Sequence, residues 1–235
     1  MSYMNAGSGA VVSNLSEDVR AGFIRRTYAH VALAVAATIV FVSFLIAVGA
    51  APVLLSFLTG GMVNMLIFMG LFIGAGIAAD RIAHSESSVT MHYAALLGYA
   101  FVEAVVVTPA IYIAALYKPA AIWDALLATS ALVAGLSWIA FSTKKDFSFM
   151  GPFLAIGTLI AMSVIIAGVV FGFSIGLVGI GAIVLLAAGC VLYNTSNIIH
   201  HYQEHQHVAA ALGLYASIAL MFRFILQFFL SFGED

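Results

Sequence analysis

The stretch VALAVAATIVFVSFLIAVGAAP, residues 31–52, decides the class of fold. It contains no charged residue, and its apolar side chains follow one another without a regular alternation with polar ones. A helix that spans a bilayer needs about 20 consecutive apolar residues, whereas a strand of a membrane barrel alternates over about 10 residues. This stretch therefore predicts a membrane-spanning α-helix.

The rest of the chain has the same character. Of its 235 residues, 64% are hydrophobic and only 8% are charged, whereas a soluble domain carries about 25% charged residues. So few charges could not cover a surface in water, and we expect an integral protein whose main partner is the lipid bilayer. The net charge of −2 and the lack of a basic stretch argue against nucleic acid as a partner.

Clusters of polar, glycine and proline residues separate seven apolar runs. We predict an all-α protein with a polar cytoplasmic tail (residues 1–24), a single membrane domain (25–232) and a short acidic end (233–235). The predicted spans are residues 29–50, 60–79, 91–115, 121–141, 150–171, 174–197 and 208–231.

The positions of the cations predict the orientation. If the spans alternate, one side of the membrane receives six of the eight cations, and the other receives Lys118. The six are Arg20, Arg25, Arg26, Arg81, Lys144 and Lys145. The positive-inside rule then predicts a cytoplasmic amino terminus, with Asp235 on the opposite face.

Two charges lie well inside predicted spans, Glu103 in GYAFVEAVVVTP and Arg223 in LMFRFILQFF. Such charges are costly in a bilayer and normally face the interior of the bundle. Both spans run in the same direction and the two depths differ by about 5 Å, so we predict an ion pair. Three interpretations stay open: a pair that locks two helices, an Arg223 that reaches outward toward Glu234 or Asp235, and a gate for a proton or cation.

The sequence contains no set of side chains typical of catalysis, so we expect no enzyme and no cofactor. A single cysteine, Cys190, excludes a metal cluster built from cysteines. His201 and His205 are four residues apart and would share a helical face, which is a spacing that metals can use. We interpret them as a solvated interfacial loop and only as weak candidates for a metal site.

Several motifs, in this order, resemble the Bax inhibitor-1 family of seven-helix membrane proteins. The motifs are FIRRTYAHVALAVA (23–36), TKKDFSF (143–149), LYNTSNIIHH (192–201) and ALGLYASIALMF (211–222). The resemblance covers residues 20–232. It implies six helices packed around the seventh, and functions that range from a pH-sensitive calcium leak to modulation of the membrane-bound protease FtsH.

The resemblance also implies a proton switch made of two aspartates, with an arginine beside one of them. The matching positions here are Asn194 in YNTS and Ser217 in LYAS, and Arg81 is the loosely matched arginine. Two nearby acids can share a proton because they cannot both ionise, whereas an amide and a hydroxyl cannot do so. The switch therefore cannot operate here in its usual form.

Two functions follow as hypotheses. The first is a regulatory protein of the bacterial inner membrane that acts in membrane stress and quality control, through a membrane-bound protease. The alternative is a pH-sensitive calcium leak whose gate has moved to Glu103 and Arg223. A calcium path needs oxygen ligands and usually carboxylates, and Glu103 is the acid that lies deepest in the predicted bundle.

Overall fold

The computed structural model describes residues 11–14, 16–85, 87–143 and 145–232. Its helices are α1 (Glu17–Ala47), α2 (Ala50–Thr59), α3 (Met62–Ala83), α4 (Val89–Tyr117), α5 (Ala120–Thr143), α6 (Gly151–Phe171), α7 (Gly176–His200) and α8 (His207–Ser231), with short 3₁₀ turns η1 (Val12–Asn14), η2 (Ser148–Met150) and η3 (Glu204–Gln206). Some predictions lie outside the described residues. They concern residues 1–10, Lys144, and the acidic end 233–235 with Glu234 and Asp235.

Within these ranges, seven helices are long and apolar enough to cross a membrane, which confirms the predicted all-α fold. They are α1 and α3 to α8, with the span of α6 starting at η2 and that of α8 at η3. The helices differ from the predicted spans mainly at their ends. For example, α1 begins at Glu17, well before the predicted span. Its first turns carry polar and charged residues, which the apolar pattern does not include.

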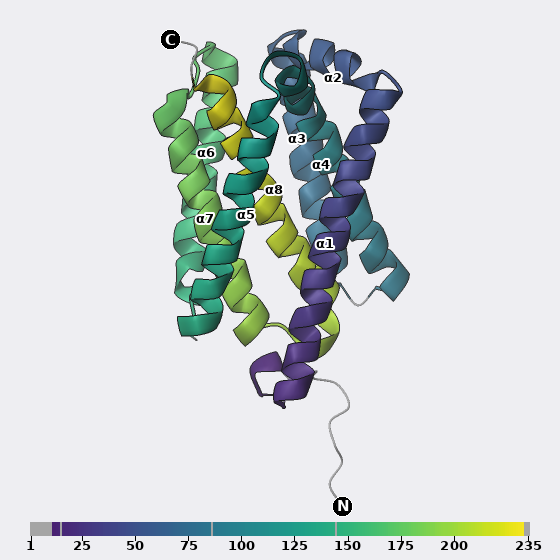
Figure 1. The fold of residues 1–235 in the computed structure, drawn as a ribbon, viewed down its shortest axis with the longest axis vertical. Coiled ribbons are helices and arrows are strands. Elements are labelled where there is room, and N and C mark those ends of the chain that lie inside the picture. Colours follow the sequence, from purple (N-terminus) through teal and green to yellow (C-terminus); the bar gives the residue numbers. More distant parts are fainter. Residues whose placement is uncertain (1–10, 15, 86, 144, 233–235) are drawn as a thin grey trace, which may run out of the picture.

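The short helix α2 lies between the first two spans, where the apolar pattern gave no separate element. Gly49 separates it from α1 with a left-handed backbone (φ 75°), and Gly61 separates it from α3 (φ 125°). Pro52 stands in the first turn of α2, where its missing N–H is not needed. Figure 1 shows α2 lying across one end of the bundle.

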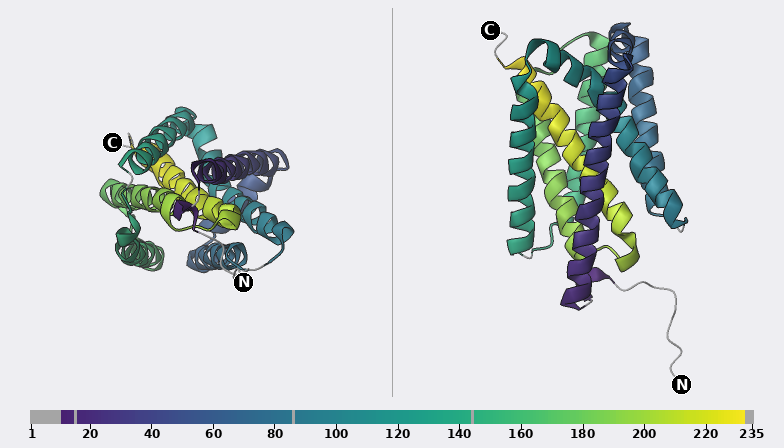
Figure 2. Two further views of the ribbon diagram at one scale, coloured as in Figure 1. Left: turned by 90° about the horizontal axis from the view of Figure 1, so that it is seen from below. Right: turned by 45° about the vertical axis from the view of Figure 1, so that its right-hand side comes forward.

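The last helix, α8, forms the centre of the bundle. Its most apolar stretch is 61% buried, whereas that of α6 has no buried residue. It packs against α1, α3, α4, α5 and α7, while α6 lies outside against α7 and α3. Figure 2, seen from below, shows α8 surrounded by the other helices. Five spanning helices therefore surround α8, whereas the resemblance implied six, because α6 lies outside this ring against α7 and α3.

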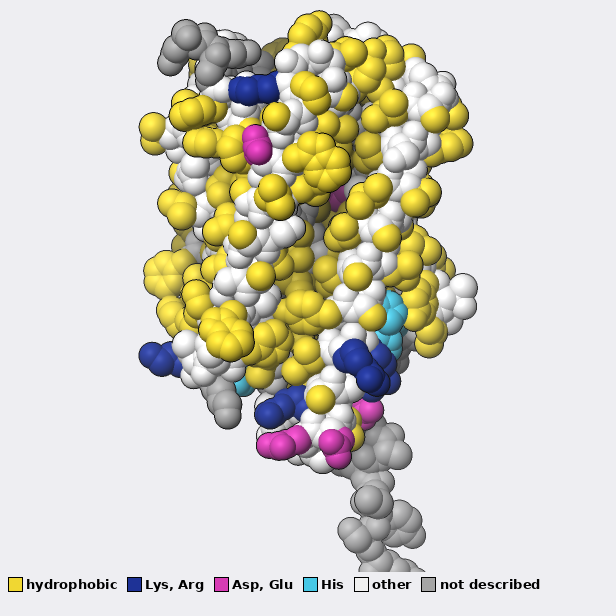
Figure 3. Space-filling view, viewed as in Figure 1, with side chains coloured by type: hydrophobic (Ala, Val, Ile, Leu, Met, Phe, Trp, Pro, Cys, Tyr) yellow, Lys and Arg dark blue, Asp and Glu magenta, His cyan; other side chains and the backbone are white. Residues whose placement is uncertain are grey.

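The two ends of the bundle differ in charge. One end holds the start of α1 and the α3–α4, α5–α6 and α7–α8 connections (Figure 1). Most of the Lys, Arg and His side chains visible in Figure 3 gather there, below a belt of hydrophobic side chains. We call it the basic end, after its residues Arg20, Arg25, Arg26, Arg81 and Lys145. That it faces the cytoplasm stays a prediction.

The described amino-terminal segment packs against the basic end. Val12 is fully buried, and its N–H donates a 2.9 Å hydrogen bond to the carbonyl of Tyr202. The hydroxyl of Ser13 donates to the carbonyl of His200 (3.3 Å). His200 ends α7, and Tyr202 lies in its connection to α8. The segment with Val12 and Ser13 therefore packs against the last helix pair.

Candidate functional site

The two charges predicted to lie inside the membrane meet between α4 and α8. Nη2 of Arg223 lies 3.4 Å from Oε2 and 3.5 Å from Oε1 of Glu103. The Glu103 side chain is 3% exposed and that of Arg223 is 18% exposed. The structure thus brings the predicted partners together. Their opposite charges compensate each other in a region where a lone charge would be costly.

Two aromatic side chains complete this ion pair. The hydroxyl of Tyr99, one helical turn before Glu103, donates a 2.9 Å hydrogen bond to Oε1 of the carboxylate. The guanidinium carbon of Arg223 lies 4.8 Å from the ring centre of Phe72 on α3, which is within the range of a cation–π interaction. Nε of Arg223 is buried and has no hydrogen-bond partner among the described residues.

A second polar contact joins α8 to α1 beside the ion pair. The hydroxyl of Tyr215 and that of Thr38 are 2.5 Å apart, and Thr38 donates to the carbonyl of Ala34 (2.9 Å). The rings of Tyr215 and Tyr99 meet edge to face with centroids 6.0 Å apart. These residues were not predicted from the sequence. Only Tyr99 gave a usable signal, since it stands four residues before Glu103 and therefore shares its helical face.

The positions that the resemblance assigns to the two aspartates also meet. Nδ2 of Asn194 on α7 donates to Oγ of Ser217 on α8 (2.7 Å) and to the carbonyl of Gly213 (3.1 Å). The hydroxyl of Ser217 donates in turn to the same carbonyl (3.0 Å). Both N–H groups of the Asn194 amide and the hydroxyl oxygen of Ser217 are therefore engaged in a neutral hydrogen-bond network. Arg81 is exposed, and within the described ranges no hydrogen bond or ion pair joins it to Asn194 or Ser217.

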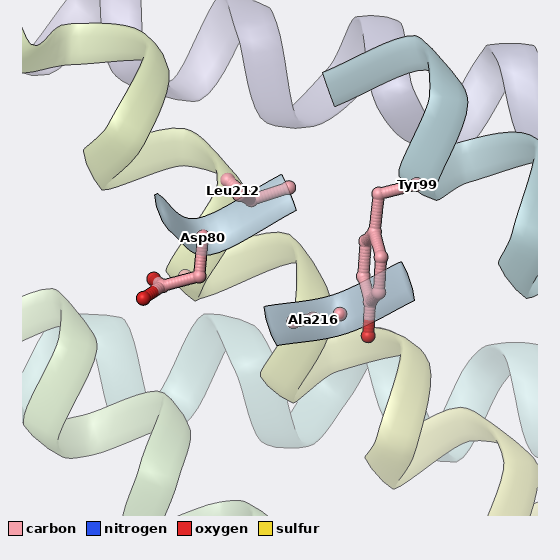
Figure 4. A pocket seen from close by; sticks show the side chains of 6 residues that line it. Asp80, Tyr99, Leu212 and Ala216 are labelled. Carbon is pink, nitrogen blue, oxygen red and sulfur yellow. The ribbon is translucent and has the colours of Figure 1, made fainter. Parts of the chain in front are cut away.

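A small cavity of about 190 Å³ is lined by Tyr99, which binds Glu103, and by Gly213, which accepts from Asn194. Residues of α3, α4 and α8 line it, namely Gly76, Asp80, Tyr99, Leu212, Gly213 and Ala216. Figure 4 shows Asp80 and Tyr99 on opposite sides of it, with the carboxylate directed away from the tyrosine ring.

Burial, together with the nearby charge of Asp80, raises the pKa of Tyr202 to about 12, so this phenol stays neutral.

Of the two histidines considered as weak metal ligands, His201 contacts an acid of another connection. Nε2 of His201 lies 2.9 Å from Oδ2 of Asp146 in the α5–α6 connection. Within the described residues there is no group of three or more His, Cys, Asp or Glu side chains arranged to hold a metal. The backbone N–H of Ser148 (2.8 Å), and to a smaller extent His201, lower the pKa of the Asp146 carboxyl. These contacts fix the TKKDFSF connection against the end of α7.

The chain is similar in sequence to known proteins. A family model described as inhibitor of apoptosis-promoting Bax1 matches residues 20–234. Protein LIFEGUARD 4 of Arabidopsis thaliana is 28% identical over 224 residues, which cover 91% of this chain and 86% of that protein. Protein LIFEGUARD 3 of the same plant is 26% identical over 220 residues, or 89% and 84%.

A bacterial relative matches over a shorter stretch. An uncharacterised protein of Pseudomonas aeruginosa is 32% identical over 115 residues, and the match covers 48% of this chain. The chain thus spans about half, 51%, of the length of that relative.

Proposed function

Because the chain belongs to the Bax inhibitor-1 family, we propose that it is a regulatory protein of a bacterial inner membrane, which acts on other membrane proteins by contact. Its process would be membrane stress and quality control, and its partner a membrane-bound protease. The family description supports this, since it names an inhibitor, a protein that acts on another protein. We propose no catalytic role for its side chains.

The hydrogen bond between Asn194 and Ser217 carries the proposal. At 2.7 Å it joins the two positions where the resemblance implies a pair of acids. A pair of acids changes its charge with pH and offers anionic oxygens to a cation, whereas an amide and a hydroxyl do neither. Helix α8 is held to α7 by a contact that does not depend on pH in the physiological range.

The contacts of Glu103 argue against the alternative, a leak with a relocated gate. Its carboxylate is already occupied by Arg223 and Tyr99, and its side chain is 3% exposed. A calcium ion typically takes 6–8 oxygen ligands, and one neutralised carboxylate supplies few of them. A structural ion pair between α4 and α8 accounts for the same contacts.

Calcium flux into proteoliposomes of the purified protein tests the first half of the proposal. We expect no flux above that of empty liposomes at about pH 6 or about pH 8. Asn194→Asp combined with Ser217→Asp restores the acid pair and should produce a pH-dependent flux. Asn197→Asp, which adds an acid near the same end of α7, is the matched control and should not. A wild-type flux that Glu103→Gln abolishes would overturn the proposal in favour of the leak.

Degradation of a membrane-protein substrate tests the second half. The purified membrane-bound protease FtsH, its substrate and this protein are reconstituted together, and the rate of degradation is measured with and without the protein. We expect the rate to change in proportion to the amount of folded protein, and heat-inactivated protein to have no effect. An unchanged rate would refute modulation of this protease.

A further inference from the structure

Two imidazoles meet where three helices join at the basic end. His30 lies on α1 and His207 is the first residue of α8, and their ring centroids are 5.0 Å apart in an edge-to-face arrangement. His30 also contacts α4, because its Nε2 lies 2.6 Å from the hydroxyl of Tyr93. The sequence pattern alone gave no reason to pair these two histidines. In the structure they form a contact between the start of the central helix and its two neighbours.

The partners of His30 select one neutral form of its ring. Nδ1 lies 2.6 Å from the carbonyl oxygen of Arg26, which can only accept, so Nδ1 carries a hydrogen. In the neutral ring, Nε2 then accepts the hydrogen of the Tyr93 hydroxyl. A proton added to Nε2 would turn this acceptor into a donor, and the Tyr93 hydroxyl would have to rotate its hydrogen away.

The surroundings of His207 also disfavour a positive charge on its ring. Its Nδ1 is buried and has no hydrogen-bond partner in the described part of the chain. Arg26, His30 and His92 are the cationic or titratable groups that lie close enough to repel a charge on it. The amino terminus of α8, where His207 stands, adds a partial positive charge of its own.

An acid near this group is already engaged. Glu204 in η3 lies 3.5 Å from Nη2 of Arg26, and both side chains are about half exposed. His92 of α4 is bound elsewhere, with its Nε2 3.0 Å from the carbonyl of Ser85. Protonation of His207 would therefore place a charge near Arg26, His30 and His92, with the backbone of Glu204 as its favourable neighbour.

From this geometry we propose that the contact between His30 and His207 is a pH-dependent latch, which holds the start of α8 against α1 and α4 while both rings are neutral and releases it when they take up protons. Histidine is the side chain whose charge ordinarily changes between pH 5 and pH 8.

The distance between α1 and the start of α8 tests the latch in protein reconstituted into lipid nanodiscs. Cys190 is replaced by alanine, and spin labels are attached at Arg25→Cys and His205→Cys, two exposed positions on either side of the junction. At about pH 8 we expect one short-distance population, and at about pH 5.5 a second, longer one. The ratio of the long to the short population should rise on acidification, because protons bind more tightly to the released form than to the latched form.

Variants separate the latch from general acid effects. His207→Phe keeps an aromatic ring but cannot take up a proton, and it should show the short distance at both pH values. His207→Lys carries a charge throughout and should show the longer distance even at about pH 8. His84→Gln removes another histidine of the basic end, at the cap of α3, and should leave the pH response intact.

Two results would overturn the proposal. One is a wild-type distance distribution that is the same at both pH values. The other is a pH response that persists in His207→Phe. If the phenylalanine variant fails to fold, His207→Gln provides the same comparison with a side chain that does not titrate. The readout is a distance within the protein, so it does not depend on which of the proposed activities the protein has.

Discussion

The hydroxyl of Tyr99 donates a 2.9 Å hydrogen bond to the carboxylate of Glu103, four residues further along α4. The contact is buried and lies beside the guanidinium of Arg223. It combines a local relationship, one turn of a helix, with a long-range one, the approach of α4 to α8.

Tyr99→Phe should destabilise the protein without changing its fold. The substitution removes the donor to a buried carboxylate, and a hydrogen bond to a charged group contributes about 1.5–3 kcal/mol. The measurement is the free energy of unfolding in mixed micelles during a titration with a denaturing detergent. Tyr117→Phe is the control, since this tyrosine of α4 is 81% exposed. Equal effects of the two substitutions would contradict the prediction.

Glu103 and Arg223 should show strong coupling in a double-mutant cycle. Glu103→Gln leaves the partly buried guanidinium without its counter-charge, and Arg223→Gln leaves the carboxylate without its own. Removing one partner of a buried pair costs about 3–5 kcal/mol, whereas removing both costs less than the sum. Additive effects in the same unfolding assay would show that the pair contributes nothing to stability.

Gly213→Ala should be destabilising, because a Cβ at this position would lie 3.2 Å from Oδ1 of Asn194. The methyl group would press on the amide that binds Ser217. Gly98→Ala on α4 has no atom within 4 Å of the new Cβ, and it should stabilise the helix by about 0.8–1 kcal/mol from propensity. Opposite signs of the two changes in unfolding free energy are the expected result, and a stabilising Gly213→Ala would refute the close contact.

Asp146 should make a pH-dependent contribution to stability. The Ser148 N–H and His201 lower the pKa of its carboxyl in the folded protein, so the ionised form is stabilised by folding. The contribution is present above the ordinary pKa of an aspartate and is lost as the pH falls through the lowered value. Because the side chain is 45% exposed, we expect less than about 1 kcal/mol.

Asp146→Asn tests this linkage. The difference in unfolding free energy between wild type and variant should be positive near neutral pH and should shrink on acidification. His201→Gln should remove a smaller part of it, since the backbone N–H of Ser148 remains. A difference that grows toward low pH would have the wrong sign for a lowered pKa.

The apolar runs were sufficient to predict the spanning helices, because each run has the length that a bilayer requires. They gave little information on what lies outside the hydrocarbon. The charged first turns of α1 and the short helix α2 belong to the regions where hydropathy no longer distinguishes helix from connection. The pairing of Glu103 with Arg223 followed from similar depth, which is a property of position along each helix.

Contacts that depend on the rotation of a helix about its own axis were harder to predict. Thr38 and Tyr215, or His30 and His207, meet because α1 and α8 turn particular faces toward each other. A helix that is apolar on all sides gives no preferred face in the sequence. The pairing of Asn194 with Ser217 was available only through the resemblance, which brought together two segments that no spacing rule connects.

The burial of Val12 against the connection between α7 and α8 has a consequence for biogenesis. A ribosome makes this residue before any of the spanning helices, yet its binding site does not exist until the final two spans have been made and inserted. Val12 can therefore reach its site only after α7 and α8 are in place, so this contact is among the final steps of assembly. A bulky substitution at Val12 would hinder that step, while the insertion of the individual helices would proceed unchanged.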